Sequence, residues 1–539
     1  MKKLFFLILF CACLCVYFGY LDSEFVFDDQ VLVVDNPLIK SARLLPGIFK
    51  TGIFEYWSGR PAYDQMYRPL QMLSYYLDYN LWGLNPAGFR LTNLLLHFFN
   101  SVLVFYFIFL LFKNRFLAQA ASLLFLVHPV QISTVAYISA RGDLLSGFFI
   151  LSCCILFLNF LNSLDYRLYF LSLLAGFLAF FSRENALLLI FLLTLVFFIS
   201  RQEKKKSGYL AGFGILYVVY FAIRFFALGP AGMAVHPVYV TGILALVNFY
   251  NIILHYLLLL FWPVNLRMFH SVPVINNLNF AFLSLAAAGV ILFISALCIG
   301  FKKRWVWFSF FWFLLGMIPV YFCFDAYPAA GKVLMAESWL YLPSIGFFTA
   351  FCVVCLLYKQ GRLIIYGCVL ILSVLVFANS AYWRSEINFY ERTAQFLPED
   401  SFIRRNLAFA YIRKGDFAPA RRLLQKLEKY YSDSPIMSSL WGQYYLAQGK
   451  PQEALRYFQR ILVKSFFTNY SVSLCYSKLD DLERAIEFSR ASFSLNSFYL
   501  PNLIQLAKLY SKIGQFDLAD KYYALAKEYN PKDRQLLIK

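Results

Sequence analysis

The chain has 539 residues, of which 60% are hydrophobic and 15% are charged, and its mean hydropathy is +0.60. Soluble globular proteins of this length do not have such a composition, so the sequence predicts a multi-span membrane protein with at least one domain outside the lipid. The net charge of +19 does not indicate nucleic-acid binding, because much of the basic excess lies in short clusters between apolar runs. We therefore expect a membrane and no nucleic acid among its partners.

Twelve apolar runs are candidates for bilayer-spanning helices, at 4–20, 92–112, 116–138, 144–161, 167–181, 185–200, 208–228, 242–262, 279–300, 305–323, 340–358 and 362–380. The first run resembles the core of a signal peptide. It lacks a small-residue cleavage site, and we expect an uncleaved span.

Basic clusters test this number of spans. Together with the N-terminus, the clusters expected on the cytoplasmic side are 113–115, 201–206, 302–304 and 359–362. That placement requires one run between 206 and 302 not to span. Run 242–262 carries Asn248, Asn251 and His255, so we expect it to be re-entrant or interfacial. Eleven spans remain, with the C-terminus on the non-cytoplasmic side of an inner, plasma or ER-like membrane.

The last part of the chain repeats. Gly415, Gly449, Asp480 and Gly514 begin similar turn segments at spacings of 34, 31 and 34 residues. This resembles the tetratricopeptide repeat, which is two antiparallel helices around a small-residue turn. We expect about four repeats, forming an α-solenoid over 383–539, after a membrane domain over 1–382.

An adjacent carboxylate pair follows the first span, in Phe25-Val-Phe-Asp-Asp-Gln30, at the start of an outer loop over 21–91. A carboxylate held near a hydroxyl can act as a general base, which favours a catalytic role for Asp28 and Asp29. Neighbouring side chains point in different directions. One is therefore expected to act on an acceptor, and the other to orient it or to hold a divalent cation. The alternative is that the pair caps a loop helix.

Arg141 and Asp143 lie at the expected outer end of a span, beyond His128. Arg141 can hold a phosphate oxygen through paired N–H donors. The alternatives are a simple ion pair between Arg141 and Asp143 and a packed, hydrogen-bonded His128.

Arg183 and Glu184 lie in a tight turn between two spans. Charges between apolar walls are costly and usually functional, so Arg183 is a second candidate phosphate ligand. The alternative is that Arg183 only orients the spans, although an outer arginine runs against the positive-inside rule.

Glu337 and Tyr341 are four residues apart and are expected on one helix face, near Lys332. Function and interfacial anchoring both fit this segment. Arg267 and His270 can reach a lipid headgroup, or they belong to an aromatic membrane belt. No phosphate-cradling glycine loop, Ser-His-Asp set or Cys/His metal cluster occurs in the sequence, so no certain cofactor is expected.

Seven segments resemble the TMTC-type (transmembrane and tetratricopeptide-repeat) protein O-mannosyltransferases and their bacterial relatives. They are Phe25-Val-Phe-Asp-Asp29, Tyr67-Arg-Pro-Leu70, Gly83-Leu-Asn-Pro86 through His97, Val127-His-Pro-Val130, Ala140-Arg-Gly-Asp-Leu144, Ser182-Arg-Glu184 and Ala336-Glu-Ser-Trp-Leu-Tyr-Leu-Pro-Ser344. Each motif alone is weak, but seven in this order are specific. Arg183 stands where the family often has Lys, and Ser338 stands where it usually has Arg or another residue.

The resemblance implies an all-α, polytopic GT-C fold. It also implies transfer of a sugar from a polyprenyl-phosphate carrier on the non-cytoplasmic side, with Asp28 at the position of the essential acid. We expect an inverting glycosyltransferase that moves mannose or another hexose to a hydroxyl of a protein or glycan. Its donor site would draw on Arg68, His128, Arg141, Asp143, Arg183, Glu184, Glu337 and Tyr341. The repeats would present a protein acceptor. A lipid-linked oligosaccharide ligase (O-oligosaccharyltransferase) and a non-enzymatic membrane scaffold remain as alternatives.

Overall fold

The computed structural model describes residues 2–58, 66–230, 242–275, 303–321, 332–397, 401–431 and 434–532. The chain divides into two compact units, which are treated separately below. The apolar unit comprises 1–22, 67–71 and 86–381, and the repeat unit comprises 23–66, 72–85 and 382–539. The outer loop over 21–91, expected within the membrane domain, therefore belongs mostly with the repeats. The reason is that its side chains bond to repeat helices, as described below.

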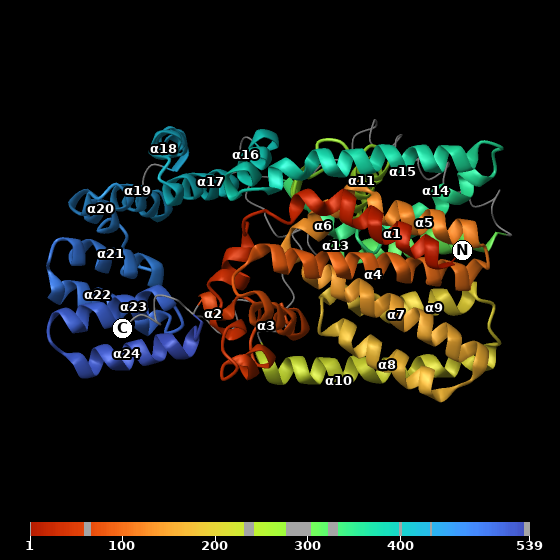
Figure 1. Cartoon of the computed structure of the whole chain (residues 1–539), viewed down its shortest axis with the longest axis horizontal. Helices are drawn as coiled ribbons and strands as arrows, with labels where there is room; N and C mark the ends of the chain where they lie inside the picture. The colour runs from red at the N-terminus through yellow and green to blue at the C-terminus, as the bar shows by residue number, and fades with distance from the viewer. Residues whose placement is uncertain are drawn as a thin grey trace. The chain divides into compact units, whose positions relative to one another are not determined.

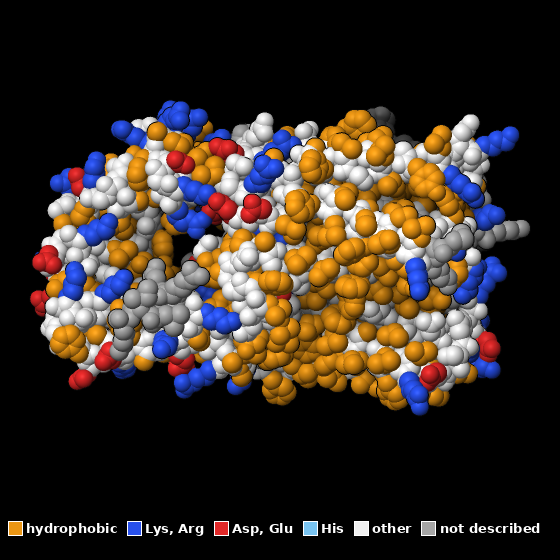
Figure 2. All heavy atoms as spheres, in the orientation of Figure 1, with side chains coloured by type: hydrophobic (Ala, Val, Ile, Leu, Met, Phe, Trp, Pro, Cys, Tyr) orange, Lys and Arg blue, Asp and Glu red, His pale blue; other side chains and the backbone are white. Residues whose placement is uncertain are grey.

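The apolar unit is built from helices whose bounds are α1 Lys2–Tyr17, α4 Pro86–Phe112, α5 Arg115–Val127, α6 Ile132–Ala136, α7 Arg141–Ser163, α8 Tyr166–Phe180, α9 Leu189–Ile199, α10 Leu210–Leu228, α11 Gly242–Phe261, α13 Arg304–Tyr321, α14 Ser344–Leu356 and α15 Gly361–Ala378. Helices α4, α7, α8 and α10 run side by side (Figure 1), and each packs against the next. Hydrophobic side chains cover the visible face of this unit almost continuously (Figure 2). Phe170, Val218 and Phe226 are 66%, 71% and 85% exposed, as lipid-facing residues would be.

The span count differs from the sequence expectation. Six described helices are long and apolar enough to cross a membrane, and a bent pair over Arg115–Val127 and Pro129–Ala136 makes a seventh candidate. Four more expected spans form apolar helices of 10–17 residues, which are shorter than the six. Run 279–300 lies outside the described residues. Helix α11, expected not to span, is 20 residues long and is apolar enough to cross a membrane. Its length and composition therefore do not set it apart from the other candidate spans.

One small sheet adds to the expected all-helical fold. Strands β1 (Phe269–Pro273) and β2 (Lys332–Ala336) pair in antiparallel register, with Phe269 opposite Ala336. The pairing joins two segments that the sequence placed in separate outer loops. It also places His270 close to Glu337, which follows β2 directly.

Two basic side chains of the apolar unit bind carbonyl groups at helix ends. Lys206 Nζ donates to the Leu161 carbonyl at 2.6 Å, and Arg304 Nη1 donates to the Ile199 carbonyl at 3.3 Å. Lys and Arg side chains gather at the end of this unit that carries the N-terminus (Figure 2). Helix α7 begins at Arg141 and ends beside this basic region, about 33 Å away at 1.5 Å per residue. The Arg141 end therefore lies at the opposite end of the helices.

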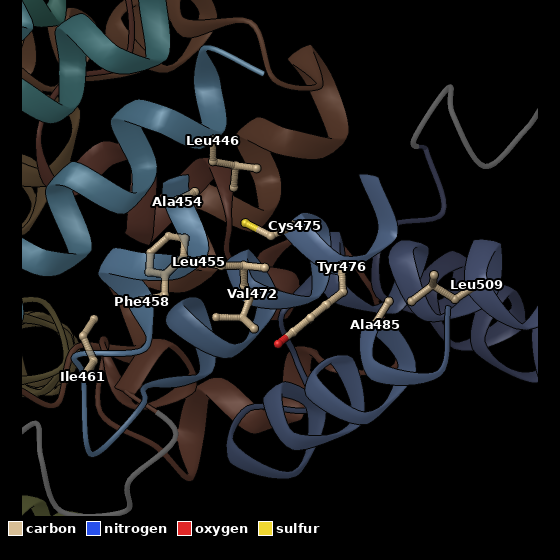
Figure 3. Close-up of a cluster of buried hydrophobic side chains, with 10 residues drawn as sticks. All are labelled: Leu446, Ala454, Leu455, Phe458, Ile461, Val472, Cys475, Tyr476, Ala485 and Leu509. Carbon is tan, nitrogen blue, oxygen red and sulfur yellow. The ribbon is translucent and has the colours of Figure 1, made fainter. Parts of the chain in front are cut away.

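The repeat unit contains short α2 (Glu55–Ser58), most of α3 (Pro69–Trp82), α16 (Glu386–Phe396) and four helix pairs. The pairs are α17 Ser401–Lys414 with α18 Phe417–Tyr431, α19 Pro435–Ala447 with α20 Pro451–Phe458, α21 Phe466–Lys478 with α22 Leu482–Leu495, and α23 Leu500–Lys512 with α24 Phe516–Tyr529. Small and aromatic side chains fill the space between pairs. One such cluster includes Ala454, Phe458, Val472 and Cys475 (Figure 3).

The repeat phase read from the sequence marks the turns inside these pairs. Gly415, Gly449 and Gly514 have φ values of 79°, 76° and 77°, and Asp480 has a φ of 60°. A residue in this left-handed region ends the first helix of a pair and redirects the chain into the second. Glycine adopts the left-handed conformation without strain, which explains why three of these four turn positions are glycine.

Candidate functional site

Four charged side chains of the apolar unit form two ion pairs where α7 begins and α8 ends. Arg183 Nη1 lies 2.5 Å from Asp143 Oδ2, and Arg68 Nε and Nη2 lie 2.8 and 2.7 Å from Glu184 Oε2. The side chains of Asp143, Arg68 and Arg183 are 3%, 11% and 15% exposed and that of Glu184 is 30% exposed, so three of the four charges are largely removed from water. Four residues expected at the donor site are thus brought together, at the end of α7 away from the basic clusters.

Gly142 allows the chain to approach closely at this place. A Cβ atom at position 142 would lie 2.6 Å from Gln71 Oε1 and 3.1 Å from the Ser182 carbonyl oxygen. Gln71 Nε2 in turn donates to the Ser139 carbonyl at 2.9 Å. The first turn of α7 therefore abuts both the Arg183 turn and the segment after Arg68 because residue 142 has no side chain.

Arg141 lies beneath this cluster and has no exposed surface. Its Nε donates to Asn93 Oδ1 at 2.7 Å and its Nη2 to the Phe89 carbonyl at 2.7 Å, which ties α7 to α4. Asp143, which the sequence offered as an ion-pair partner for Arg141, pairs with Arg183. Of the two arginines expected to hold phosphate, Arg183 is the one with exposed side-chain surface.

His128 is 2% exposed, and both of its ring nitrogens have backbone partners. Nδ1 accepts from the Val130 amide at 3.2 Å, so Nε2 carries the hydrogen that it donates to the Leu260 carbonyl at 3.0 Å. This is the packed, hydrogen-bonded histidine that the sequence left open as the alternative to donor binding.

Glu337 and Tyr341 do not share a helix face, which corrects the sequence expectation. The segment Glu337–Leu340 is a 3₁₀ helix, in which residues three apart, rather than four, lie above one another. Glu337 is fully buried, and its Oε1 accepts from His270 Nε2 at 2.8 Å and from the Arg267 amide at 2.7 Å. Its Oε2 has no hydrogen-bond partner among the described residues.

Tyr341 instead faces α4 and α7. Its hydroxyl lies 3.0 Å from His97 Nδ1 and accepts from Asn100 Nδ2 at 2.9 Å. A Cβ atom at Gly147 would lie 3.0 Å from the Tyr341 ring, so this glycine makes room for it.

The Asp28-Asp29 pair lies in the repeat unit, in an irregular segment. Phe27 has a φ of 53°, and the π-helix Gln30–Val34 follows the pair. Such backbone outliers are concentrated at functional sites. Asp29 is fully buried, and its Oδ2 accepts from the Val26 amide at 3.2 Å, whereas Asp28 is half-buried. Asp29 therefore stabilises the loop before the π-helix, and Asp28 is the more accessible carboxylate.

Aromatic residues from the helices before and within the first repeat surround this segment. The Phe27 ring lies 6.3 Å from Phe389, 6.4 Å from Tyr390 and 6.0 Å from Phe402, measured between ring centroids. Tyr390 also interacts electrostatically with Asp28. The aromatic frame that the sequence suggested for the pair thus comes partly from residues about 360 positions away in the chain.

Asp35 and Tyr56 extend this site, and sequence reasoning missed both. Burial raises the pKa of Asp35, while the hydrogen bond from Gln30 and the charges of Lys40 and Arg413 lower it. Tyr56 is 6% exposed and interacts electrostatically with Asp35 and Asp28, and its hydroxyl has no hydrogen-bond partner among the described residues. No motif marks either residue, since each is defined by burial against distant parts of the chain.

The expectation that Asp28 and Asp29 hold a divalent cation stays a prediction. Within the described ranges, no group of three or more His, Cys, Asp or Glu side chains is placed to share a metal ion. Lys332, named from the sequence beside Glu337, lies in β2, and its side chain is outside the described residues.

Comparison with known proteins supports both parts of the chain. Two family models described as tetratricopeptide repeat match residues 406–434 and 500–533, which are the first and last helix pairs. Among solved structures, the crystal structure of MamA protein is similar to 29% of this chain and 87% of that chain, at 19% identity and a TM-score of 0.23.

Curated relatives match up to 74% of the chain. The chain is 26% identical to protein O-mannosyl-transferase F38B6.6 of Caenorhabditis elegans, over 74% of this chain and 59% of that protein. It is 36% identical to TMTC1 and 35% identical to TMTC4, both protein O-mannosyl-transferases of Homo sapiens, over 17% and 19% of their lengths. The chain thus spans less than two thirds of these relatives. They confirm the resemblance read from the sequence: this chain is similar to the TMTC-type protein O-mannosyltransferases, with apolar helices of membrane type followed by tetratricopeptide repeats.

Proposed function

We propose that this protein is an integral membrane glycosyltransferase that moves a hexose, mannose first among the candidates, from a polyprenyl-phosphate carrier to a hydroxyl of a protein acceptor. The observation that carries the proposal is the interlocked cluster of Arg68, Glu184, Arg183 and Asp143 at the end of the apolar helices away from the basic clusters. Charged side chains in such surroundings are costly, and they mark functional sites by default. The names of the curated relatives support the same reaction.

In this proposal the non-cytoplasmic side is the side of the charged cluster. The basic clusters, which gather near the N-terminus, would face the cytoplasm by the positive-inside rule. The lipid tail of the carrier would lie along the apolar helices, and its phosphate would bind Arg183 and Arg68. Guanidinium groups suit phosphate because their N–H donors match its oxygens in pairs.

Asp28 acts as the general base in this proposal. It takes the proton from the acceptor hydroxyl while the oxygen forms a bond to the anomeric carbon, and the bond from that carbon to the phosphate oxygen breaks. The carrier phosphate leaves with the electron pair, and the arginine charges stabilise it. Attack on the face opposite the leaving group inverts the anomeric centre, through an oxocarbenium-like transition state. The greater exposure of Asp28 compared with Asp29 supports this division of roles.

The proposal is tested by mass spectrometry of non-cytoplasmic proteins from cells with and without this protein. We expect hexose on Ser or Thr of a set of proteins to disappear on deletion and to return with the wild-type chain but not with Asp28→Asn. Return with Asp28→Asn would contradict the proposed reaction and favour the scaffold. Loss of an oligosaccharide instead of single hexoses would favour the oligosaccharide ligase.

A further inference from the structure

Two asparagines at equivalent places in successive repeats hold the segment that carries Asp28. Asn496 follows α22 and Asn530 follows α24, 34 residues later, and they are 5% and 4% exposed. Asn496 Nδ2 donates to the Tyr56 carbonyl at 2.9 Å, and Asn530 Oδ1 accepts from the Tyr79 hydroxyl at 2.7 Å. The last two repeats therefore use one position to bind chain segments of the repeat unit that precede the repeats, at Tyr56 and at Tyr79.

Further contacts surround these two bonds. Arg43 Nη1 lies 2.8 Å from Glu528 Oε2, and Leu44 packs against the cluster of buried side chains between α23 and α24. Lys532 Nζ donates to the Asn80 carbonyl at 3.0 Å and lies 5.4 Å from the centre of the Tyr79 ring. Buried and charged groups thus both favour docking of the segment at this end of the repeats.

A second attachment lies at the other end of the array. Lys414 Nζ lies 2.5 Å from Glu24 Oε1, and the Glu386 amide donates to Glu24 Oε2 at 3.3 Å. The rings of Phe27 and Phe402 add an edge-on contact. Figure 2 shows an opening through the repeat unit, between the repeat helices and this segment. The segment is therefore held at two separate places rather than lying along the array.

The attachment at Asn496 bears on Asp28 through Tyr56. The carbonyl of Tyr56 is the group that Asn496 binds, and the charge of Asp28, after burial and Asp35, is among the causes that raise the pKa of the Tyr56 hydroxyl, so Tyr56 and Asp28 are neighbours. Release of Tyr56 would change the surroundings of Asp28. Because a misplacement of about 1 Å can lower a rate about a hundredfold, small movements of this kind matter for catalysis.

We propose that the last two tetratricopeptide repeats position the Asp28 segment, with Asn496 and Asn530 as positioning residues. The repeats then act on the chemical step and not only on acceptor capture. This inference rests on the proposed function, in which Asp28 is the base.

The test uses the full-length protein with both asparagines replaced, Asn496→Ala with Asn530→Ala. Hydrogen exchange should show protection in 26–35 and 53–58 reduced about tenfold or more, since an opening that is easier by 1.4 kcal/mol has this effect. With polyprenyl-phosphate mannose and a Ser/Thr peptide, kcat should fall about tenfold or more, while KM for the donor should stay within about twofold. A merely structural role would lower the amount of active enzyme but would not loosen these residues selectively.

Gln459→Ala is the control, because Gln459 directly follows α20 in the second repeat and is exposed. It should leave exchange and turnover unchanged. If the double variant does not fold, Asn496→Ala alone replaces it, since this change removes the amide that donates to the Tyr56 carbonyl. The smaller change should still loosen the segment and lower kcat.

Wild-type exchange in the folded variants, or a loosened segment with unchanged kcat, would overturn the proposal. Absence of transfer by the wild-type enzyme would instead contradict the proposed function. The exchange experiment would then still decide whether the repeats hold the segment.

Discussion

The charged cluster of the apolar unit and the Asp28 segment of the repeat unit are held in different ways. Arg68, Asp143, Arg183 and Glu184 lie at ends of regular helices or in a tight turn, and their partners are one another. Asp28 lies between a residue with positive φ and a π-helix, and its neighbours come from remote helices. The geometry of the charged cluster therefore depends on individual ion pairs within it, whereas the geometry of the Asp28 segment depends on the repeat helices that hold it.

The largest loss of stability is expected when one charge is removed from the charged cluster. Arg183→Met leaves Asp143 buried without its ion-pair partner, and we expect a loss of about 3–5 kcal/mol in stability. The double variant Arg183→Met with Asp143→Asn should recover most of this loss, because no charge remains unpaired. Thermal unfolding in detergent measures both. Equal stability of the single and double variants would show that the pair does not act as a unit.

The next largest loss of stability is expected from a side chain added at Gly142, where the chain segments approach closely. In Gly142→Ala the new Cβ would lie 2.6 Å from Gln71 Oε1 and 3.1 Å from the Ser182 carbonyl, so a neighbour must move. We expect a loss of about 1–3 kcal/mol, as for other overpacked sites. Gly214→Ala, in α10 with nothing near its Cβ position, is the control and should be neutral or slightly stabilising. An unchanged melting temperature for Gly142→Ala would contradict the geometry at the Arg183 turn.

Substitutions in the repeat turns should change stability by smaller amounts, in opposite directions at two equivalent positions. Gly514 has a φ of 77° and open space around its Cβ position, so Gly514→Ala should lower stability by about 1 kcal/mol through backbone strain alone. Asp480 occupies the equivalent place at a φ of 60°, so Asp480→Gly should raise stability by up to about 1 kcal/mol. Chemical denaturation of the full chain measures both. A shift of the same sign in the two variants would contradict the shared turn geometry.

The smallest expected effect is a pH dependence at Asp35. Burial raises the pKa of Asp35 in the folded chain, so the unfolded chain loses this proton at lower pH and the ionised carboxylate opposes folding. The stability contribution of Asp35 therefore falls as pH rises from the ordinary aspartate pKa through the raised value. Asp35→Asn should stabilise the protein at neutral pH and make no difference in acid. A difference between the two melting temperatures that is constant with pH would contradict this assignment.

Sequence reasoning succeeded where local pattern determines structure. Apolar runs predicted the helices of the apolar unit, and the phase of Gly415, Gly449, Asp480 and Gly514 predicted the repeat turns. It listed 242–262 among the candidate spans but set this run aside as re-entrant or interfacial, because the placement of the basic clusters left one run too many and this one carries polar residues. Helix α11 has the length and composition of a span, and its re-entrant placement stays a prediction. The small sheet was missed because its strands pair across 60 residues and neither strand is long.

The candidate sites divide in the same way. Arg68, Asp143, Arg183 and Glu184 were named from motifs, and the structure brings them together. Asp35, Tyr56 and the two asparagines of the last repeats were not named, because their roles come from burial and from contacts hundreds of residues apart. Only a structure joins such positions.

The most direct test of the central claim uses the purified protein in lipid nanodiscs with polyprenyl-phosphate mannose and a Ser/Thr-containing peptide. Asp517→Asn, an exposed carboxylate in the first turn of α24, serves as the matched control. If Asp28 is the general base, the wild-type and control proteins should add one hexose to the peptide with inversion at the anomeric carbon. Asp28→Asn should add none while still binding the carrier. Wild-type rates of transfer by Asp28→Asn would contradict the account.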